Sequence, residues 1–270
     1  MEEALTAQSL EPLLSPLRDD PASAAVLTDI DGTLAPIVER PELAAVPEEA
    51  QRLLAELSET YGLVGCVSGR RAKEARELVG LPGIGYAGNH GLELLLPRED
   101  ELRFDPGVRG HEGDAASYLA GLDREALAAQ GIRIEDKGPI QALHWRGAPD
   151  ERAAEARARE VGAGAGRAGL DCRWGRKVLE LRPKGGGGKE AAVAALLATD
   201  GIDAAIYAGD DRTDLDAFRR LRELRERGRL RAAVCVGVLS GEGPAEIGEE
   251  SDIAVDGPQG WLAVLRALAG

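Results

Sequence analysis

Short apolar runs alternate with helix-like segments along most of this 270-residue chain. The run AAVLTD (24–29) is followed by PEEAQRLLAELSETYG (47–62), which has a proline at a helix start, acidic residues in its first turn and a terminal glycine. The next apolar run, LVGCVSG (63–69), again precedes a helical pattern. Such alternation is typical of β-α-β units, so the sequence predicts an α/β fold on a parallel sheet. The same rhythm returns late, with strand-like runs at 204–210, 231–238 and 252–255.

The middle of the chain breaks this rhythm. Between residues 106 and 183 the pattern is a helix, two strands, a helix and two more strands. This order is typical of a small α+β layer, in which an antiparallel sheet has two helices on one face. The stretch RPKGGGGK (182–189) then marks the return to the first pattern. The sequence therefore predicts a core domain in two parts, 1–105 and 184–270, with an inserted α+β cap domain over 106–183.

Charge and composition disfavour several classes of protein. The formal net charge is −14 at pH 7, which opposes binding to nucleic acid or to an anionic membrane. No apolar stretch has the length of a membrane-spanning helix, and the acidic start of the chain lacks the apolar segment of a secretory signal. We therefore expect a cytoplasmic protein with no nucleic-acid or membrane partner. Three scattered cysteines and three histidines with no i, i+4 pair leave a hard, oxygen-bound ion as the candidate metal.

Polar side chains follow the apolar runs where parallel strands would end. Asp29 and Asp31 follow the first strand, and Ser68 follows the second. Lys189 begins a late helix, although Lys184 lies nearby as an alternative. Because open parallel sheets bind ligands beyond the carboxyl ends of their strands, these groups are expected to meet at one site. Three further carboxylates follow a late strand and join the set: Asp210, Asp211 and Asp214.

These residue types are suited to phosphoryl transfer. A carboxylate such as Asp29 can attack a phosphoryl group and form an aspartyl-phosphate, provided that cations and donors offset the repulsion between anions. Mg²⁺, which prefers oxygen ligands, is the expected cofactor, held by Asp29, Asp210 and a backbone carbonyl near Asp31. Asp211 and Asp214 would then orient the waters of the ion or the lysine.

The groups beside the nucleophile have other expected tasks. Asp31 would give a proton to the leaving oxygen and recover one from the attacking water. Ser68 and the amides around Gly69 would hydrogen-bond the phosphoryl oxygens, while Lys189 supplies a positive charge. Arg70, in the same VSGRR segment, is assigned to substrate binding.

Four segments resemble, in order, the four motifs of the haloacid-dehalogenase phosphatase superfamily: DIDGTLAP, VSGRR, the helix that starts at Lys189, and GDDRTD. Finer matches at GNHGLE (88–93), EDKGPIQALHWR (135–146) and VLELRPKGGGGK (178–189) resemble the trehalose-6-phosphate phosphatase family within it. The resemblance implies a Rossmann-like core with an α+β cap. It also implies Mg²⁺-dependent hydrolysis of trehalose 6-phosphate to trehalose and phosphate.

The same resemblance implies which residues read the sugar. Glu135, Lys137 and Glu180 match cap residues that hydrogen-bond sugar hydroxyls in the family, with Arg182 as a neighbouring support. Two further residues match the core side of the substrate pocket, namely Asn89 and His90. Two departures from the family pattern are Glu190 in place of a usual glycine and Trp145 in place of a usual tyrosine.

Other interpretations compete with these. GGGGK is not a nucleotide P-loop, because Pro183 and Glu190 occupy positions that such a loop reserves for glycine and for serine or threonine. Without the resemblance, the pair Glu135 and Lys137 would pass as exposed surface charges. The arginine-rich run 219–231 is most simply a solvated helix face. Two alternative functions are the same chemistry on another sugar phosphate, such as sucrose phosphate, and a non-catalytic sugar-phosphate sensor.

Overall fold

The computed structural model of the chain describes residues 7–38, 43–241 and 243–270. It divides into two compact units, a core unit of residues 1–103 with 187–270 and a cap unit of residues 104–186. The expected cap limits, 106 and 183, lie just inside those of the cap unit. Parts of the expected first core segment, residues 1–6 and 39–42, lie outside the described residues.

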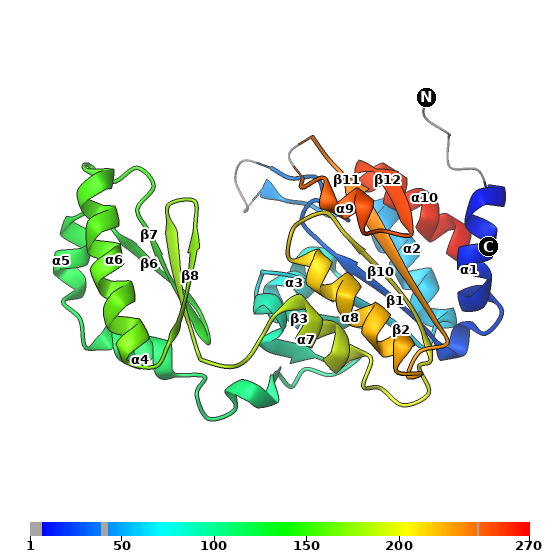
Figure 1. Cartoon of the computed structure of the whole chain (residues 1–270), viewed down its shortest axis with the longest axis horizontal. Helices are drawn as coiled ribbons and strands as arrows, with labels where there is room; N and C mark the ends of the chain where they lie inside the picture. The colour runs from blue at the N-terminus through cyan, green and yellow to red at the C-terminus, as the bar shows by residue number, and fades with distance from the viewer. Residues whose placement is uncertain (1–6, 39–42, 242) are drawn as a thin grey trace. The chain divides into compact units, whose positions relative to one another are not determined.

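One mostly parallel sheet forms the centre of the core unit (Figure 1). Counted from the edge strand β12, the first six strands run parallel to one another. The seventh strand, β4, runs antiparallel to the sixth, β3. The central strand is buried along its whole length, which explains its continuously apolar sequence. Among the described residues the order is β12 (Ile253–Asp256), β11 (Ala232–Leu239), β10 (Ala204–Gly209), β1 (Ala24–Asp29), β2 (Leu63–Val67), β3 (Gly85–Gly88), β4 (Glu93–Leu95) and β5 (Arg103–Phe104).

Helices cover both faces of this sheet, as the α/β prediction requires. The side chains of alternate strand residues pack into two separate apolar clusters, one on each face. Short 3-10 turns lie at Pro21–Ser23 and Asn89–Gly91. One face carries α1 (Ala7–Arg18), α2 (Glu48–Thr60), α3 (Ala72–Val79) and α10 (Gly257–Ala269), and the other carries α7 (Lys189–Leu196), α8 (Asp214–Glu226) and the short α9 (Glu246–Glu249).

The sequence pattern did not predict α1, whose interior contains two prolines that normally interrupt helices. Its apolar residues Leu10, Leu14 and Leu17 recur at helical spacing and are buried against the sheet. Tertiary packing of this stripe therefore outweighs the local cost of the prolines.

The cap unit has the α+β layout expected from its sequence. Its four strands form an antiparallel sheet in the order β6 (Arg133–Lys137), β7 (Ile140–His144), β9 (Val178–Arg182) and β8 (Asp171–Gly175). The first expected helix is two short helices, because Asp123 accepts a hydrogen bond from the Ala126 amide and starts a new one. An apolar cluster joins one face of the sheet to α4 (Asp114–Ala120), α5 (Arg124–Ala129) and α6 (Glu151–Arg167), and a 3-10 turn lies at Pro106–Val108.

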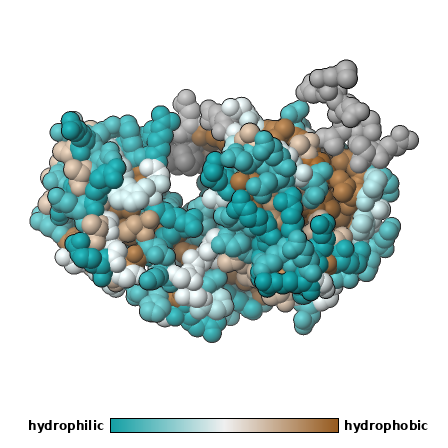
Figure 2. Space-filling model, in the orientation of Figure 1, coloured by the Kyte–Doolittle hydropathy of each residue, from teal (hydrophilic) through white to brown (hydrophobic). Residues whose placement is uncertain are grey.

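The surface over α8 is mostly hydrophilic (Figure 2). Ion pairs between helix neighbours line it, such as Arg219 with Asp216 and Arg220 with Glu223. The first residues of the arginine-rich run 219–231 therefore lie on a solvated face of α8, as predicted. Within the described ranges, no helix is long and apolar enough to cross a membrane. The cytoplasmic location and the absence of a nucleic-acid partner stay predictions.

Candidate active site

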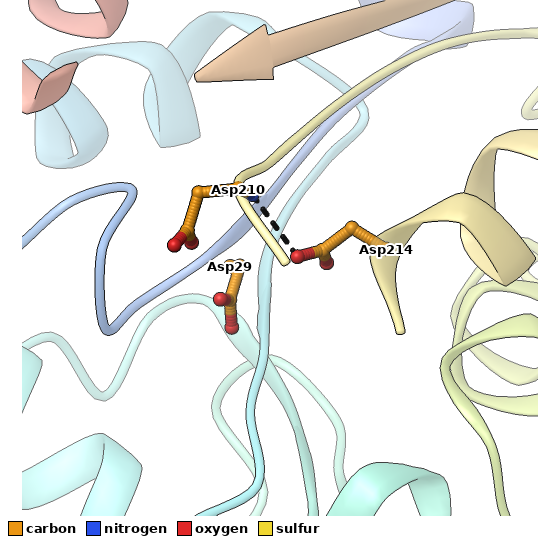
Figure 3. Close-up of side chains that lie close together, drawn as sticks. All are labelled: Asp29, Asp210 and Asp214. Carbon is orange, nitrogen blue, oxygen red and sulfur yellow. Dashed lines mark hydrogen bonds between the residues drawn. The ribbon is translucent and has the colours of Figure 1, made fainter. Parts of the chain in front are cut away.

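Three carboxylates from separate elements meet at the carboxyl edge of the core sheet (Figure 3). Asp29 is the last residue of β1, Asp210 follows β10, and Asp214 is the first residue of α8. One oxygen from each lies within 4.8 Å of the other two, and all three residues are buried. Because β1 and β10 are parallel neighbours, the sheet itself places Asp29 beside Asp210.

Lys189 supplies positive charge to this cluster from the first turn of α7. Its side chain is 2% exposed, and Nζ lies 2.7 Å from Asp214 Oδ1 and 3.2 Å from Asp29 Oδ2. Burial alone would lower the pKa of Lys189, but the surrounding carboxylates outweigh it and raise that pKa above its usual value. The lysine is therefore a charged ammonium group at neutral pH. Lys184 is exposed, so the structure places Lys189, and not Lys184, at the site.

Asp214 is held by donors at both of its oxygens. Oδ1 accepts hydrogen bonds from Lys189 Nζ and, at 2.5 Å, from the hydroxyl of Tyr207. Oδ2 accepts the backbone amides of Asp210 and Asp211 at 3.1 and 3.0 Å. Gly209 leaves the room for this contact, since a Cβ there would lie 2.1 Å from the Asp214 carboxyl carbon. Asp214 thus orients the lysine and the loop after β10.

Asp211 lies in the turn between β10 and α8 and is not part of the three-carboxylate cluster. Its Oδ1 accepts hydrogen bonds from both the amide and the hydroxyl of Thr213 at 2.7 Å, and lies 3.8 Å from Lys189 Nζ. Burial raises the pKa of Asp211, but Lys189 and Thr213 outweigh it and lower the value overall. A role for Asp211 at the metal, by direct contact or through the waters of the ion, stays a prediction.

The charges of this cluster fit a hard divalent cation. Burial raises the pKa of Asp29 well above its usual range, although Lys189 opposes the rise. Burial also raises the pKa of Asp210 to about 6, although a hydrogen bond of 2.9 Å from Thr33 opposes it. Several carboxylates thus share one buried ammonium group, and such a surplus of negative charge is costly without a counter-ion. The oxygen donors of Asp29 and Asp210 would hold Mg²⁺.

The loop after β1 requires a glycine at position 32. Its φ is +94°, a conformation that favours glycine, and a Cβ at this position would lie 2.1 Å from Asp210 Oδ2. The glycine therefore allows the loop after β1 to approach the Asp210 carboxylate closely.

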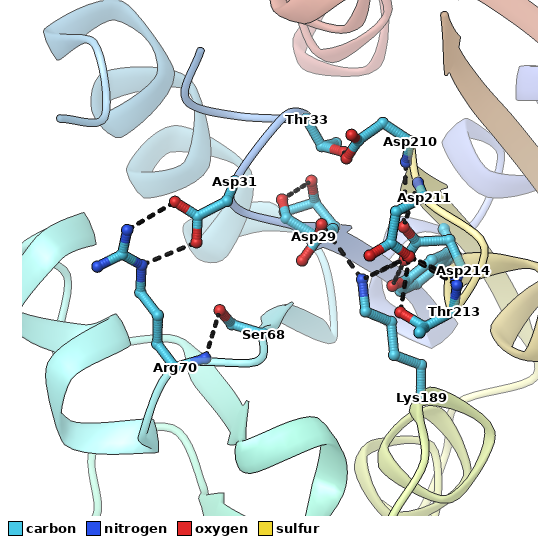
Figure 4. Close-up of polar contacts among 12 residues, drawn as sticks. Asp29, Asp31, Thr33, Ser68, Arg70, Lys189, Asp210, Asp211, Thr213 and Asp214 are labelled. Atoms are coloured by element: carbon cyan, nitrogen blue, oxygen red, sulfur yellow. Dashed lines mark hydrogen bonds and ion pairs between the residues drawn. The ribbon is translucent and has the colours of Figure 1, made fainter. Parts of the chain in front are cut away.

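Asp31 points away from Asp29 and pairs with Arg70 (Figure 4). Arg70 Nε and Nη2 donate to the two oxygens of Asp31 at 2.8 and 2.7 Å, and this contact raises the pKa of Arg70. The Asp31 side chain is 40% exposed, so solvent reaches it. The structure thus shows Asp31 as an ion-paired carboxylate, and contact between Arg70 and substrate stays a prediction. Ser68 Oγ accepts the Arg70 amide at 3.1 Å, which orders the loop after β2.

Asn89 and His90 lie directly after β3, beside the Ser68 loop. Asn89 is fully buried, whereas His90 is half-buried. The imidazole lies over Gly69, where a Cβ would be 2.9 Å from the ring. Gly69 therefore leaves space for the His90 ring, and substrate contact by Asn89 or His90 stays a prediction.

The predicted sugar-reading residues of the cap unit share one face of its sheet. Ala142 of β7 pairs with Glu135 on one side and with Glu180 on the other, so these two carboxylates flank it. Lys137 Nζ donates to Glu180 at 3.3 Å, and Arg182 Nη2 donates to the second oxygen of Glu180 at 2.7 Å. The opposite face carries buried leucines against the helices. The cap sheet thus presents charged groups on the face that its helices leave uncovered.

Two groups at the site were missed by the sequence reasoning. Tyr207 donates to Asp214, and its only signal was a polar-tipped aromatic residue inside an otherwise aliphatic strand. Thr33 donates to Asp210 from the loop that carries Asp31, and the sequence pattern gave no signal for this side-chain contact. In the cap unit, His144 at the end of β7 contacts a predicted sugar-reading residue, with its Nε2 2.8 Å from Glu135 Oε2.

The parallel core sheet and the inserted α+β unit have the fold of a haloacid dehalogenase-like hydrolase from Bacteroides thetaiotaomicron, with a TM-score of 0.59 at 15% identity, over 90% of this chain and 98% of that one. The C-terminal domain of trehalose-6-phosphate phosphatase from Candida albicans has this fold, with a TM-score of 0.70 at 23% identity, over 99% of this chain and 98% of that one. The family model described as trehalose-phosphatase matches residues 27–246. The chain belongs to the trehalose-phosphatase family.

One of two similar curated relatives carries the name of this family. A trehalose-phosphate phosphatase of Mycobacterium bovis is 34% identical over 207 residues, which cover 72% of this chain and 50% of that protein. An uncharacterized glycosyl hydrolase of Mycobacterium tuberculosis is 35% identical over 210 residues, 73% of this chain and 15% of that protein. The chain thus spans half or less of these two longer relatives.

Proposed function

We propose that this chain hydrolyses trehalose 6-phosphate to trehalose and phosphate with Mg²⁺ as its cofactor. The observation that carries the proposal is the buried Asp29, with Lys189 at 3.2 Å and Asp210 beside it at the end of the parallel sheet. A protein that only binds a sugar phosphate does not need a nucleophile, and burial of the charged Asp29 carboxylate costs free energy. Membership of the trehalose-phosphatase family supports the substrate.

In the first step, an oxygen of Asp29 attacks phosphorus and the bond from phosphorus to the sugar oxygen breaks. Asp31 gives a proton to that oxygen, so that trehalose leaves as an alcohol. To carry this proton, Asp31 must release one of its two hydrogen bonds from Arg70. Ser68 and Lys189 offer donors and charge to the phosphoryl oxygens.

In the second step, water attacks the phosphorus of the aspartyl-phosphate and the bond to Asp29 breaks. Asp31 accepts the proton of that water, phosphate leaves and the carboxylate of Asp29 is restored. Mg²⁺, when bound by Asp29 and Asp210, neutralises phosphoryl charge. Tyr207 and Asp214 keep the lysine in place throughout.

The cap unit supplies the sugar specificity in this proposal. Glu180 is fixed by Lys137 and Arg182, and Glu135 lies across Ala142 on the same face. Carboxylates accept two hydrogen bonds at each oxygen, so they suit the vicinal hydroxyls of a disaccharide. Preorganised side chains of this kind lose little conformational entropy when the sugar binds.

Glu180→Ala tests this assignment. We expect kcat/KM for trehalose 6-phosphate to fall roughly 10- to 100-fold, since hydrogen bonds to a charged group contribute about 1.5 to 3 kcal/mol. Turnover of p-nitrophenyl phosphate, which has no sugar, should change by less than about twofold, because the core residues of the transfer steps are intact. Steady-state kinetics on both substrates measures the difference.

The matched control is Glu155→Ala, which removes a cap carboxylate that pairs with Arg159 on α6. This variant should keep both activities. Equal losses on the sugar phosphate and the aryl phosphate in Glu180→Ala would show that the cap face does not read the sugar.

A further inference from the structure

Three consecutive residues after β3 have a left-handed backbone. The φ values are 50° for Asn89, 54° for His90 and 90° for Gly91. Two neighbouring non-glycine residues in this region cost on the order of 1 to 3 kcal/mol each, and they persist where surrounding contacts enforce them. The contacts that enforce this turn therefore indicate what it is for.

The left-handed turn joins two segments of the active site. The Asn89 amide donates to the carbonyl of Arg70 at 2.6 Å, and the His90 amide donates to the carbonyl of Ser68 at 3.0 Å. On its other side, the His90 carbonyl accepts the amide of Gly188 at 2.5 Å. Gly188 immediately precedes Lys189, so the turn fixes the Ser68 loop relative to the start of α7.

Gly91 completes this connection. A Cβ at Gly91 would lie 2.6 Å from the carbonyl oxygen of Gly188 and 3.0 Å from the amide of Ala192. The turn and the first residues of α7 are thus in close backbone contact. A shift of the turn would move the Ser68 loop and the lysine helix together.

Glu93, the first residue of β4, lies behind the turn and is 1% exposed. Its Oε2 accepts the amide of Ala72, the first residue of α3, at 2.9 Å. Its Oε1 lies 3.6 Å from Arg71 Nε, and the side chain of Asn89 is a further polar neighbour of the carboxylate. Burial raises the pKa of Glu93, although the Ala72 amide, Arg71 and Asn89 each act to lower it. One buried carboxylate thus contacts both the left-handed turn and the chain directly after the Ser68 loop.

We propose that Glu93 is a positioning residue for phosphoryl transfer, which holds the Ser68 loop and Lys189 in register through the left-handed turn. The inference rests on the proposed function for its chemistry, and it concerns the transfer steps rather than the choice of sugar. Glu93 is not a catalytic residue, because its carboxylate is enclosed by Ala72, Arg71 and Asn89. It acts on the reaction through the backbone of the turn.

The test compares Glu93→Ala with the isosteric Glu93→Gln. The alanine variant leaves the Ala72 amide without its acceptor, and we expect kcat to fall about 10- to 100-fold, as for other groups that support a catalytic side chain. The fall should be equal on trehalose 6-phosphate and p-nitrophenyl phosphate, with KM for the sugar phosphate within about twofold of wild type. The glutamine variant keeps an oxygen that can accept the Ala72 amide. Its kcat should therefore lie between that of wild type and that of Glu93→Ala.

Asp252→Ala is the control for a purely structural loss. Asp252 accepts the amide of Cys235 at 2.7 Å in β11, two strands from β1. This variant should lower the thermal midpoint without changing kcat per folded molecule. If Glu93→Ala or Glu93→Gln behaves like this control, the positioning role is wrong.

Two outcomes separate this inference from the proposed function. Wild-type protein that turns over the aryl phosphate but not trehalose 6-phosphate would overturn the substrate, while a fall in aryl phosphate kcat in the Glu93 variants would still support the positioning role. If Glu93→Ala does not fold, Glu93→Gln decides alone: a kcat lowered severalfold at unchanged KM supports the role, and a wild-type kcat overturns it.

Discussion

Asp29→Asn should lower phosphate release from trehalose 6-phosphate by roughly 10,000-fold or more, because the amide cannot act as the nucleophile. The substitution keeps the shape of the side chain and removes a charge that burial disfavours, so the fold should be retained. Binding of trehalose 6-phosphate should stay measurable by isothermal titration calorimetry.

Asp203→Asn is the matched control for this change. Asp203 precedes β10 at the opposite end of the sheet and pairs with Arg231 at 2.8 Å on the surface. The control should release phosphate at the wild-type rate. An Asp29→Ala variant guards against conversion of the asparagine back to aspartate. Phosphate release by both Asp29 variants within about tenfold of wild type would mean that another group is the nucleophile.

Lys189→Met should destabilise the metal-free protein by about 3 to 5 kcal/mol, because it leaves buried carboxylates without their ammonium partner. The pKa of Lys189 is raised in the folded chain, so its contribution is fully present at pH 7 and is lost only when the pH rises through that value. Urea denaturation at pH 7 in the presence of a chelator measures the loss. Turnover should fall with it, since the phosphoryl oxygens lose a positive charge.

Lys184→Met provides the comparison. Lys184 is exposed and only five positions away, so its replacement should change the free energy of unfolding by less than about 0.5 kcal/mol. A similar small change for Lys189→Met would show that the lysine does not stabilise the carboxylate cluster.

The sequence predicted the strands well because buried parallel strands are apolar throughout. β1 and β10 are continuously buried, and their ends place Asp29 and Asp210 where the pattern put them. The haloacid-dehalogenase fold and the trehalose-phosphatase family were confirmed. By contrast, α1 was missed, since Pro12 and then Pro16 break the helical propensity that tertiary packing restores.

Side-chain partners were harder to predict than strands, because they depend on packing between distant segments. No pattern shows that Arg70 pairs with Asp31, or that the Tyr207 hydroxyl reaches Asp214. The contact of Glu93 with Ala72 is of the same kind, since it joins β4 to the start of α3. Sequence spacing places residues on elements, whereas their hydrogen bonds follow from how those elements pack.

The most direct test of the central claim is phosphate release from a panel of phosphosugars with Mg²⁺ and with a chelator. The panel contains trehalose 6-phosphate, sucrose 6-phosphate and glucose 6-phosphate. We predict that kcat/KM is highest for trehalose 6-phosphate by at least about tenfold, a difference of about 1.4 kcal/mol in transition-state binding. Activity should disappear in the chelator and return with added Mg²⁺. A preference for the monosaccharide phosphate, or equal turnover in the chelator, would contradict the account.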